Sequence, residues 1–492
     1  MSDYILAIDQ GTTGSTVLLL DKDLNLVSRG YREFRQIYPK PGWVEHDPGD
    51  IWNSVTGAIA DALKEWGMEN PPIKAIGITN QRETSIIWDR RTGRPMHNAI
   101  VWQCRRTADI CQKLKDGGHE DLFRQKTGLV LDPYFSGTKY KWILDQVTGL
   151  RESASAGKIA AGTVDSYLVY RLTGSQSHVT DVSNASRTLL MDIHKGDWDP
   201  ELCSILDVPQ SILPKIVGSA EVYGYTKGVP GLADGIPVSG MAGDQQAALF
   251  GQACFTPGEA KCTYGTGAFM LMNTGDKPAI GSGGLLGTIA WNLDGTMQYA
   301  SEGSAFIAGA AVQWLRDSLG FIESASQVEA LAASVPDSEG VIVVPAFVGL
   351  GAPHWRPEAR GIMTGLTRGT TRAHITRATL EGIALQNVDI LKLMEKESGR
   401  DIKALKVDGG ACANNLLMQM QADFLGCTIV RPKLVETTAL GAAFLAGLGA
   451  GLFSGVDDIR ASWQEDRVFE PKMKDAEREE ILARWREAIN KA

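Results

Sequence analysis

The sequence predicts an α/β protein, and a repeated strand–turn–strand pattern suggests that it consists of two similar lobes. Apolar runs rich in β-branched residues alternate with longer segments of helical periodicity, which is typical of α/β folds. An apolar strand, a Gly/Thr turn and a second apolar strand occur near the N-terminus, and the same succession occurs again past the middle of the chain. Two unrelated β-turns would also explain this repeat, so the residues alone leave both interpretations open.

The alternation consists of short apolar runs, which we expect to form strands, and longer periodic segments, which we expect to form helices. The expected strands include residues 4–9, 73–79, 340–347 and 404–410. The expected helices include residues 50–65, 305–319, 371–395 and 473–489. The last helix places Ile481, Leu482, Trp485 and Ile489 on one face among charged residues, so we expect it to be amphipathic and to lie at the surface.

The two repeated turns are candidate phosphate sites. The first turn is GTTG at residues 11–14, and the second is GTG at residues 265–267. Glycines let backbone N–H groups approach an anion closely, and threonine hydroxyls add further donors. Asp9, at the end of the first strand, is a candidate Mg²⁺ ligand. The P-loop pattern is absent, and a purely structural turn is the alternative interpretation.

Arg82 and Glu83 follow the strand 73–79 and are candidates for binding a neutral polyol. Ligands of α/β proteins bind at the carboxyl ends of strands. A guanidinium donates hydrogen bonds to hydroxyl groups and a carboxylate accepts them, so the pair suits such a ligand. Trp102 and Tyr134 could cover the carbon edge of the polyol. The alternatives are a surface ion pair for the charged residues and core packing for the aromatic ones.

Asp244 follows the apolar run 236–240 and is a candidate general base. Phosphoryl transfer needs positioning, charge neutralisation and a carboxylate that accepts the proton of the attacking hydroxyl. An N-cap of the expected helix 245–252 would explain Asp244 equally well. Residues 406–415 form another strand that runs into glycines, where the backbone offers a platform for a nucleobase and Asn414 could bind the base or ribose. A plain strand–helix turn is the alternative there.

Composition restricts the partners of the protein. The 492 residues carry a formal net charge of −9, from 49 Lys and Arg against 58 Asp and Glu. This acidic balance argues against broad binding to nucleic acid or to membrane surfaces, because both need basic patches. The seven cysteines form no CxxC motif, and we expect buried, reduced thiols of a cytoplasmic protein.

One uncharged stretch, residues 437–456, approaches the length of a membrane span. It contains five glycines, and small residues dominate it. We therefore expect a tightly packed helix that runs into a Gly-rich loop, and no membrane insertion. The N-terminal residues also lack the basic region of a signal peptide.

Two long patterns resemble those of the FGGY family of carbohydrate kinases. One is YFSGTKYKWILDQ at residues 134–146, and the other is GIMTGLTRGTTRAHITRATLE at residues 361–381. Further segments are similar to the members of that family that phosphorylate glycerol, namely residues 41–48, 101–108, 242–252 and 301–317. The resemblance extends over essentially the whole chain.

The resemblance implies a duplicated ribonuclease-H-like fold of the actin/hexokinase type, with the active site in the cleft between two lobes. The N-terminal lobe is expected at residues 1–250, with the polyol site and the first phosphate turn. The C-terminal lobe is expected at residues 251–492, with the nucleotide site and the second phosphate turn. The resemblance further implies ATP- and Mg²⁺-dependent phosphorylation of glycerol to sn-glycerol 3-phosphate, in the cytoplasm, by a homodimer or homotetramer.

The resemblance also implies roles for individual residues. Asp244 is the implied general base, and Asp9 is implied to organise Mg²⁺. The residues implied to bind glycerol are Arg82, Glu83, Trp102, Tyr134, Asp244, Gln245 and Phe269. The residues implied to bind ATP are Thr12, Thr13, Gly14, Thr266, Gly309, Gln313, Gly410 and Asn414. In one departure, Thr16 stands where the family usually has a phosphate-contacting arginine, and Gly14 stands where it usually has serine.

Two alternative functions stay open at this point. One is a kinase for another small polyol, such as erythritol, a pentitol or dihydroxyacetone. The other is a non-catalytic sensor of a nucleotide or sugar, for which Thr16 is the best support. The set of Arg82, Glu83, Trp102 and Phe269 favours a three-carbon substrate over larger polyols.

Overall fold

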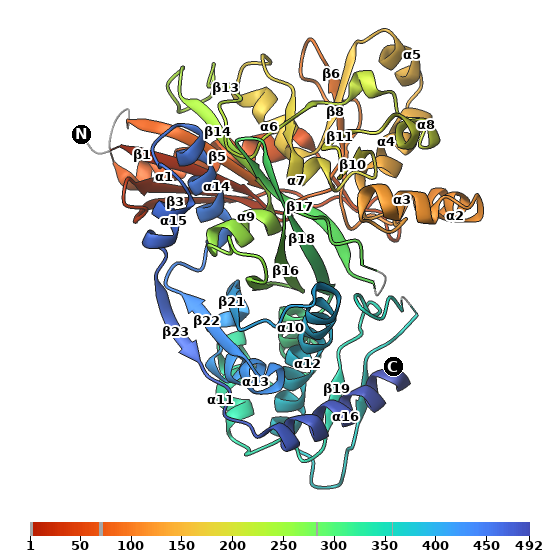
Figure 1. Ribbon diagram of the computed structural model, residues 1–492, viewed down its shortest axis with the longest axis vertical. Coiled ribbons are helices and arrows are strands. Elements are labelled where there is room, and N and C mark those ends of the chain that lie inside the picture. Colours follow the sequence, from red (N-terminus) through yellow and green to blue (C-terminus); the bar gives the residue numbers. More distant parts are fainter. Residues whose placement is uncertain (1–2, 68–71, 282–283, 357) are drawn as a thin grey trace.

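The computed structural model describes residues 3–67, 72–281, 284–356 and 358–492. It confirms the α/β class, with two lobes that each contain one large mixed sheet. Figure 1 shows the lobe of the first half of the chain above, in red to yellow, and most of the second half below it, in green to blue. Each lobe is built around its own sheet, so the strand order of the two sheets can be compared directly.

The first sheet has six strands in the order β13-β14-β5-β1-β2-β3. These strands are Gly224–Tyr225, Pro237–Gly243, Ile73–Asn80, Tyr4–Gln10, Gly14–Asp21 and Leu26–Glu33. β1 and β2 form an antiparallel hairpin, and β3 lies antiparallel to β2. On the other side of β1, β5 and β14 run parallel to it, and β13 is an antiparallel edge strand.

The second sheet repeats this succession in the order β17-β18-β16-β15-β21-β22-β23. Its strands are Leu286–Leu293, Thr296–Ala305, Ala268–Gly275, Ala260–Tyr264, Ala404–Asp408, Thr428–Pro432 and Glu465–Phe469. β15 and β16 form an antiparallel hairpin, β18 lies antiparallel to β16, and β21 and β22 run parallel to β15. β23 is again an antiparallel edge strand. This shared topology confirms a duplicated fold, so the two Gly/Thr turns are equivalent hairpin tips rather than unrelated turns.

Corresponding helices cover the two sheets. Helix α1 (Pro48–Trp66) packs on β2 and β3, and helix α12 (Arg372–Ser398) packs on β16 and β18. Both agree closely with the expected segments. The expected helix 305–319 starts later, as α10 (Gly309–Asp317), because β18 continues to Ala305. The expected strand 340–347 is shorter, as β19 (Ile342–Val344), because Pro345 follows and cannot donate to a ladder.

The remaining elements lie outside the two large sheets and the helices described so far. In the N-terminal half they are β4 (Glu45–His46), β6 (Ile86–Asp89), β7 (Ala99–Ile100), α2 (Ala108–Asp116), α3 (Glu120–Thr127), α4 (Ser136–Gln146), α5 (Leu150–Ser155), β8 (Ile159–Gly162), α6 (Val164–Leu172), β9 (Val179–Asp181), α7 (Val182–Ala185), β10 (Met191–Asp192), β11 (Asp197–Trp198), α8 (Pro200–Ile205) and β12 (Lys215–Val217). In the C-terminal half they are α11 (Val328–Ala333), β20 (Ile362–Thr364), α13 (Asn415–Leu425), α15 (Val456–Ser462) and α16 (Asp475–Lys491). The last helix buries Trp485 and Ile489, as its pattern predicted.

Two helices join the lobes. Helix α9 (Asp244–Gly251) follows the last parallel strand of the first sheet and packs against β15 and β16 of the second. Helix α14 (Thr437–Gly449) follows the last parallel strand of the second sheet and packs against β1, β5 and β14 of the first. Figure 1 shows this blue helix among the red strands. Each lobe therefore sends one helix to the other, and the boundary expected near residue 250 stays a prediction.

The glycines of the uncharged stretch allow this helix exchange. A Cβ atom on Gly441 of α14 would lie 1.9 Å from the carbonyl oxygen of Ala247 in α9. A Cβ atom on Gly77 of β5 would lie 2.1 Å from the carbonyl oxygen of Ala442. The backbones of α9, α14 and β5 therefore touch directly. The stretch is a packed helix, as expected, and the described residues contain no helix long and apolar enough to cross a membrane.

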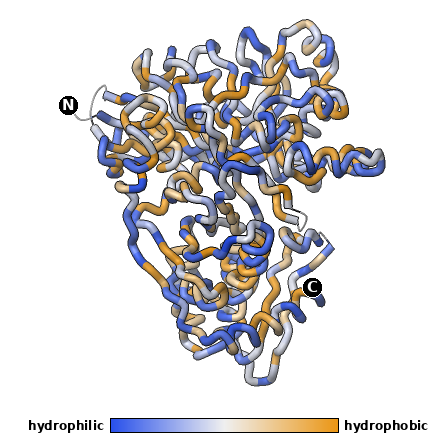
Figure 2. Tube along the Cα trace, in the orientation of Figure 1, coloured by the Kyte–Doolittle hydropathy of each residue, from blue (hydrophilic) through white to orange (hydrophobic). Residues whose placement is uncertain are grey.

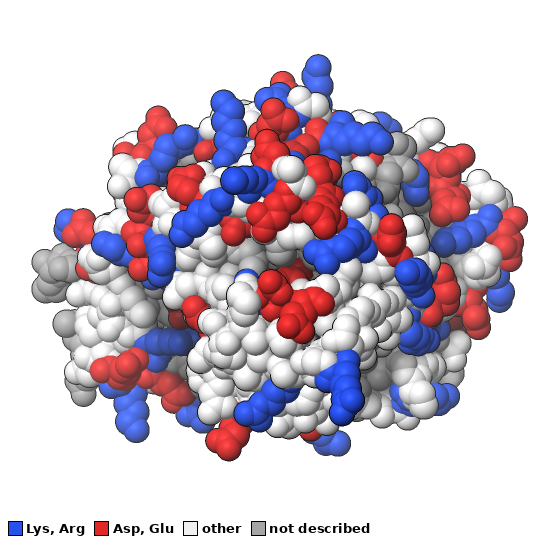
Figure 3. Space-filling model, turned by 90° about the horizontal axis from the view of Figure 1, so that it is seen from below, with Lys and Arg blue, Asp and Glu red and all other residues white. Residues whose placement is uncertain are grey.

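The distribution of polar and apolar residues fits this architecture. Figure 2 shows hydrophobic and hydrophilic segments interspersed through both lobes. On the face that Figure 3 presents, acidic and basic side chains are intermixed rather than segregated into one basic field. All seven cysteines are free thiols, and each of them except Cys427 is buried. The buried thiols agree with the expectation from cysteine count and spacing.

We predict that the Gly441→Ala variant will lose about 3 kcal/mol of unfolding free energy, because its new methyl group meets a backbone oxygen that cannot move independently of α9. Urea denaturation followed by fluorescence will measure the loss. Gly455→Ala is the matched control, since Gly455 has extended φ of 172° and no atom lies within 4 Å of its Cβ position. Equal stability of both variants would contradict the direct backbone contact between α9 and α14.

Candidate active site

The candidate site residues Asp9, Arg82 and Asp244 lie close together because they belong to three neighbouring strands or follow them directly. β5 lies between β1 and β14, and Gln10, Asn80 and Gly243 are aligned at the ends of these three parallel strands. Asp9, Arg82 and Asp244 therefore come from adjacent strand ends. This is the edge at which open α/β sheets bind ligands.

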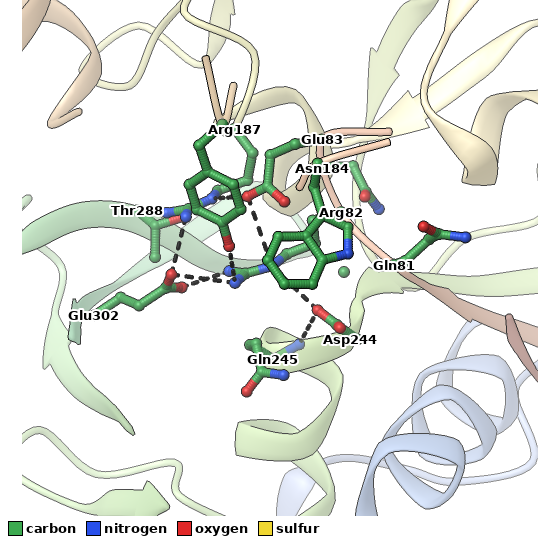
Figure 4. A network of polar contacts seen from close by, with 12 residues as sticks. Gln81, Arg82, Glu83, Asn184, Arg187, Asp244, Gln245, Thr288 and Glu302 are labelled. Atoms are coloured by element: carbon green, nitrogen blue, oxygen red, sulfur yellow. Dashed lines mark hydrogen bonds and ion pairs between the residues drawn. The ribbon is translucent and has the colours of Figure 1, made fainter. Parts of the chain in front are cut away.

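A buried ionic network forms the floor of this edge (Figure 4). The Arg82 guanidinium donates to both carboxylate oxygens of Glu302, over 2.5 and 3.1 Å. Arg187 donates from Nη2 to Glu302 over 2.9 Å and from Nε to Glu83 over 2.7 Å. All four side chains are at most 2% exposed. Arg82 and Glu83 are thus no surface ion pair, and the network ties β5 to β18 of the other lobe.

The network shifts the pKa values of its carboxyl groups in opposite directions. Burial raises the pKa of Glu83, and the charges of Arg82 and Arg187 only partly offset this effect. Burial also acts to raise the pKa of Glu302, but the charges of Arg187 and Arg82 outweigh it and lower that pKa to about 2. Glu302 therefore stays ionised and holds the two guanidinium groups in place.

The backbone of Glu83 is held in a strained conformation. Its φ angle is 59°, in the left-handed region that non-glycine residues rarely adopt. Three side chains donate to its carbonyl oxygen, namely Ser85 over 3.1 Å, Ser136 over 3.0 Å and Lys139 over 3.1 Å. Lys139 also donates to the carbonyl oxygen of Tyr134 over 2.5 Å. These bonds fix the direction of the Glu83 side chain relative to Tyr134.

Asp244 is the first residue of α9, and Gly243 occupies the N-cap position. The expectation of a plain N-cap at Asp244 is therefore wrong, because the helix begins one residue earlier than the sequence suggested. The carboxylate accepts from the backbone N–H of Gln245 over 2.8 Å and pairs with Arg82 Nε over 3.1 Å. Its side chain is 31% exposed, in contrast to the buried network beneath it. It is thus a positioned carboxylate that an incoming hydroxyl can reach.

Three aromatic residues lie together beside this carboxylate. The Trp102 ring makes edge contacts with the rings of Tyr134 and Phe269, at centroid distances of 5.7 and 6.5 Å. The Tyr134 hydroxyl accepts from Arg82 Nη2 over 3.4 Å. Trp102 Nε1 donates to Thr12 Oγ1 over 3.0 Å and so links this aromatic group to the first hairpin tip. The arrangement joins β16 of the second lobe, through Phe269, to the polar residues of the first lobe.

The first hairpin tip contains Thr12, Thr13 and Gly14, where Gly11 N–H donates to the Gly14 carbonyl over 2.9 Å. A Cβ atom on Gly14 would lie 2.8 Å from both the Tyr31 hydroxyl and the Arg32 carbonyl. Position 14 therefore has no room for a side chain, because Tyr31 and the backbone of Arg32 in β3 lie against it. Thr16 lies next to Asp9 and Tyr31 in the ladder, so its short side chain belongs to the same face.

Asp9 fits the role of a Mg²⁺ ligand. Its pKa is raised to about 7, chiefly by burial and also by the negative charge of Asp244, while the charge of Arg29 on β3 acts to lower it. Two carboxylates near one another favour a bound divalent cation, which would offset their repulsion. No group of three metal-ligating side chains gathers in the described part of the chain, so Mg²⁺ would also need phosphate and water ligands.

The second hairpin tip adjoins the start of α10. The carbonyl of Thr266 accepts from the N–H groups of Ala308 and Ala310, over 2.8 and 3.1 Å, and the Gly309 N–H donates to Gly265 over 2.9 Å. A Cβ atom on Gly309 would lie 2.6 Å from the Gly265 carbonyl oxygen, so glycine is needed for this approach. Gln313 lies one turn further along the same helix, on its exposed side.

Gly410 and Asn414 follow β21, the neighbour of the second hairpin. Gly410 is open, with no atom within 4 Å of its Cβ position. Asn414 is the N-cap of α13, and its Oδ1 accepts from the Leu417 N–H over 2.9 Å. The oxygen of Asn414 is therefore used by the helix, which leaves its NH₂ group for any ligand. Of the residues predicted to bind ATP, those of the second lobe lie at the second hairpin tip, in the first turns of α10 and between β21 and α13, whereas Thr12, Thr13 and Gly14 lie at the hairpin tip of the first lobe.

Sequence reasoning missed three charged residues of the site, namely Arg187, Glu302 and Lys261. Lys261 of β15 is fully buried and donates to Gln245 Oε1 over 2.5 Å. Burial lowers the pKa of Lys261, and the charges of Asp408, Cys262 and Asp244 oppose this effect. A charge inside a predicted strand was the available signal for Lys261, whereas no strand was predicted around Glu302. Arg187 follows the short helix α7 and carries no such signal.

Comparison with known proteins places the chain in a family. The model for the N-terminal domain of the FGGY family of carbohydrate kinases matches residues 4–251, and the model for its C-terminal domain matches residues 260–450. This protein is an FGGY carbohydrate kinase. The hairpins, the exchanged helices and the buried ionic network described above are thus features of an FGGY kinase.

Individual relatives of this FGGY kinase match it over nearly their whole length. The glycerol kinase of Myxococcus xanthus is 59% identical over 99% of both chains. Glycerol kinase 2 of Thermotoga maritima is 56% identical over 99% of this chain and 98% of its own. The crystal structure of Plasmodium falciparum glycerol kinase with ADP has a TM-score of 0.94 and 38% identity, and it covers 100% of this chain and 98% of that one.

We predict that Glu302→Gln will lower the unfolding free energy by about 3 kcal/mol, because two buried guanidinium groups lose their shared carboxylate. Urea denaturation at several pH values will measure this loss. In the folded protein the pKa of Glu302 is about 2, which is below its ordinary value of 4.5. The stabilisation by ionised Glu302 is therefore fully present above pH 4.5 and is lost as the pH falls toward 2. The difference between wild type and variant should therefore shrink over this range.

Asp317→Asn is the control for this experiment, because Asp317 pairs with Arg316 at the exposed surface and both side chains are at least 37% exposed. We expect a change below about 1 kcal/mol there. A loss no larger than this in the Glu302 variant would show that the network does not hold the lobes together.

Proposed function

We propose that this kinase transfers the γ-phosphoryl group of ATP to a terminal hydroxyl of glycerol and forms sn-glycerol 3-phosphate. The observation that carries the proposal is the partly exposed Asp244 carboxylate, which pairs with Arg82. Arg82 also contacts Tyr134 of the aromatic group, and Trp102 of this group is bonded to Thr12 in the first hairpin tip. Identity above 55% over the full length to several glycerol kinases supports the substrate.

The glycerol site would be formed by the network and the aromatic group. Arg82 would donate to glycerol hydroxyls, and the Glu83 oxygen that Arg187 leaves free would accept from one of them. Tyr134 and Gln245 would add polar contacts, while Trp102 and Phe269 would cover the carbon chain. The support for these roles is geometric, because Glu83 and Arg82 cannot rotate away from the ligand without breaking buried ion pairs.

Asp244 would accept the proton of the attacking hydroxyl. The Gln245 N–H and Arg82 Nε both contact Oδ1 of its carboxylate, so Oδ2 takes part in neither contact, and the side chain is 31% exposed. Phosphoryl transfer depends mainly on position and charge, and a carboxylate at this place completes what the nucleophile needs. Closure of the lobes around both substrates would exclude water from the transfer.

ATP would lie between the two hairpin tips. Thr12, Thr13 and Gly14 would face its γ-phosphate, and Thr266 and Gly309 would face the inner phosphates. Gln313, Gly410 and Asn414 would face the nucleoside. Mg²⁺, held near Asp9, supplies neutralisation of the phosphate charge when it is bound. Backbone N–H groups at the tips provide anion contacts without a net positive surface, which agrees with the acidic chain.

The cellular compartment and the oligomeric state also belong to this proposal. We expect the reaction in the cytoplasm, which the free, buried thiols support. We expect a homodimer or homotetramer, and light scattering of the purified protein will measure the mass. The alternatives of another small polyol and of a sensor without activity are separated by the experiments below.

We predict that purified protein with ATP and Mg²⁺ will release ADP in the presence of glycerol and far more slowly with erythritol, pentitols or dihydroxyacetone. The identity over the full length to several glycerol kinases favours glycerol over a longer polyol. A coupled assay of ADP release across this panel will give kcat/KM for each. If ADP release does not depend on glycerol, the proposed function is wrong.

We predict that Asp244→Asn will reduce kcat by roughly 10²- to 10⁴-fold, since an amide cannot accept the hydroxyl proton. Titration with ATP should show binding close to that of wild type. Asp475→Asn is the matched control, because Asp475 is also the first residue of a helix and lies at the surface. Turnover of the Asp244 variant near the wild-type rate would exclude its role as base.

A further inference from the structure

Lys261 is an unusual residue for the interior of a sheet. It is the second residue of β15, is fully buried, and faces the N-terminal end of α9. Its ammonium group donates to Gln245 Oε1 over 2.5 Å and to Thr263 Oγ1 over 2.8 Å. No carboxylate lies within salt-bridge distance of Lys261 among the described residues. A buried cation is costly, so its retention next to Asp244 needs an explanation.

The contact with Gln245 fixes the orientation of an amide group. An ammonium group only donates hydrogen bonds, so the atom of Gln245 that faces Lys261 must be the carbonyl oxygen. The NH₂ group of the amide is then directed away from Lys261. Gln245 neighbours Asp244, so a substrate oxygen in this part of the cleft would meet an N–H donor beside a carboxylate acceptor.

This donor–acceptor pair has a consequence for proton transfer. A hydroxyl that accepts a hydrogen bond from an amide NH₂ group uses a lone pair for it, and its own proton must point elsewhere. With Asp244 adjacent, the proton is directed toward the carboxylate that accepts it. If the amide were free to rotate by half a turn, its carbonyl oxygen would compete with Asp244 for the same proton.

Lys406 is a lysine with a purely structural role, and it serves as a comparison for Lys261. It is the ladder partner of Lys261 on β21, and it donates to the carbonyl oxygens of Gln252 and Ala253 over 2.6 and 3.2 Å. These carbonyls lie at the C-terminal end of α9. The two lysines thus attach opposite ends of one helix to the second sheet, but only Lys261 contacts a side chain of the proposed glycerol site.

We propose that Lys261 is a positioning residue that orients the Gln245 amide so that its NH₂ group faces the glycerol hydroxyl beside Asp244. The proposal rests on glycerol phosphorylation as the function of the site. It assigns a role to a residue that touches neither substrate. It also predicts that Lys261 and Gln245 act as one unit.

A double-mutant cycle tests this unit. Lys261→Met and Gln245→Leu should each raise KM for glycerol by roughly tenfold, which corresponds to about one hydrogen bond. KM for ATP should change less than about twofold. The double variant should be no worse than either single variant, since both remove the same contact to substrate. Independent losses that multiply would overturn the proposal.

Gln245→Glu provides a variant that retains the anchor. Its carboxylate would still accept from Lys261, so the fold should keep its stability, but the NH₂ donor is lost. We expect wild-type unfolding free energy together with the raised KM for glycerol. Wild-type KM in this variant would overturn the proposal even if Lys261→Met fails to fold.

Lys406→Met is the matched control. It should lower stability, because α9 loses its C-terminal anchor, but leave KM for glycerol unchanged in the folded fraction. If Lys261→Met behaves in the same way as Lys406→Met, then Lys261 is only an anchor. Wild-type protein is assayed first, so that a missing glycerol-dependent ADP release is assigned to the proposed function and not to Lys261.

Discussion

The ion pair between Arg82 and Glu302 connects the two sheets beside the candidate site, and the geometry of the site depends on it. Arg82 comes from the end of β5 in the first sheet and Glu302 from β18 in the second. Through Arg187, the same carboxylate also controls the direction of Glu83. A buried ion pair stabilises little by itself, but it is specific, because any other alignment of the lobes would leave charges unpaired in the interior.

Close packing of α9 and α14 holds the two lobes together, and the ion pair alone would not. The exchange of α9 and α14 buries apolar residues of both lobes in one shared cluster, which includes Ala247, Leu249, Ala443 and Leu445. Glycines let these helices and β5 approach so closely that their backbone atoms are in contact. Packing thus brings the lobes together, and the ionic network decides how they are aligned.

Sequence patterns predicted the α/β class, the two hairpins and the strand ends that carry Asp9, Arg82 and Asp244. They did so because each depends on a local signal, namely an apolar run followed by a turn or a charged residue. Helix exchange and the roles of Arg187 and Glu302 depend on contacts between segments far apart in the sequence, which no local pattern encodes. The alternative in which Asp244 is the N-cap of α9 was wrong by one residue, because a sequence pattern locates the start of a helix only to within a residue or two.

The position of α9 determines which parts of the molecule can move. Both lobes hold this helix, one by its chain connection to β14 and the other through Lys261 and Lys406. A movement of the lobes that kept the ion pair between Arg82 and Glu302 intact would therefore pivot at α9 and would displace the two hairpin tips more than this helix. Asp244 is the first residue of α9 and would shift little. The proposed base would then stay aligned with its proposed substrate while the distance between the hairpin tips changes.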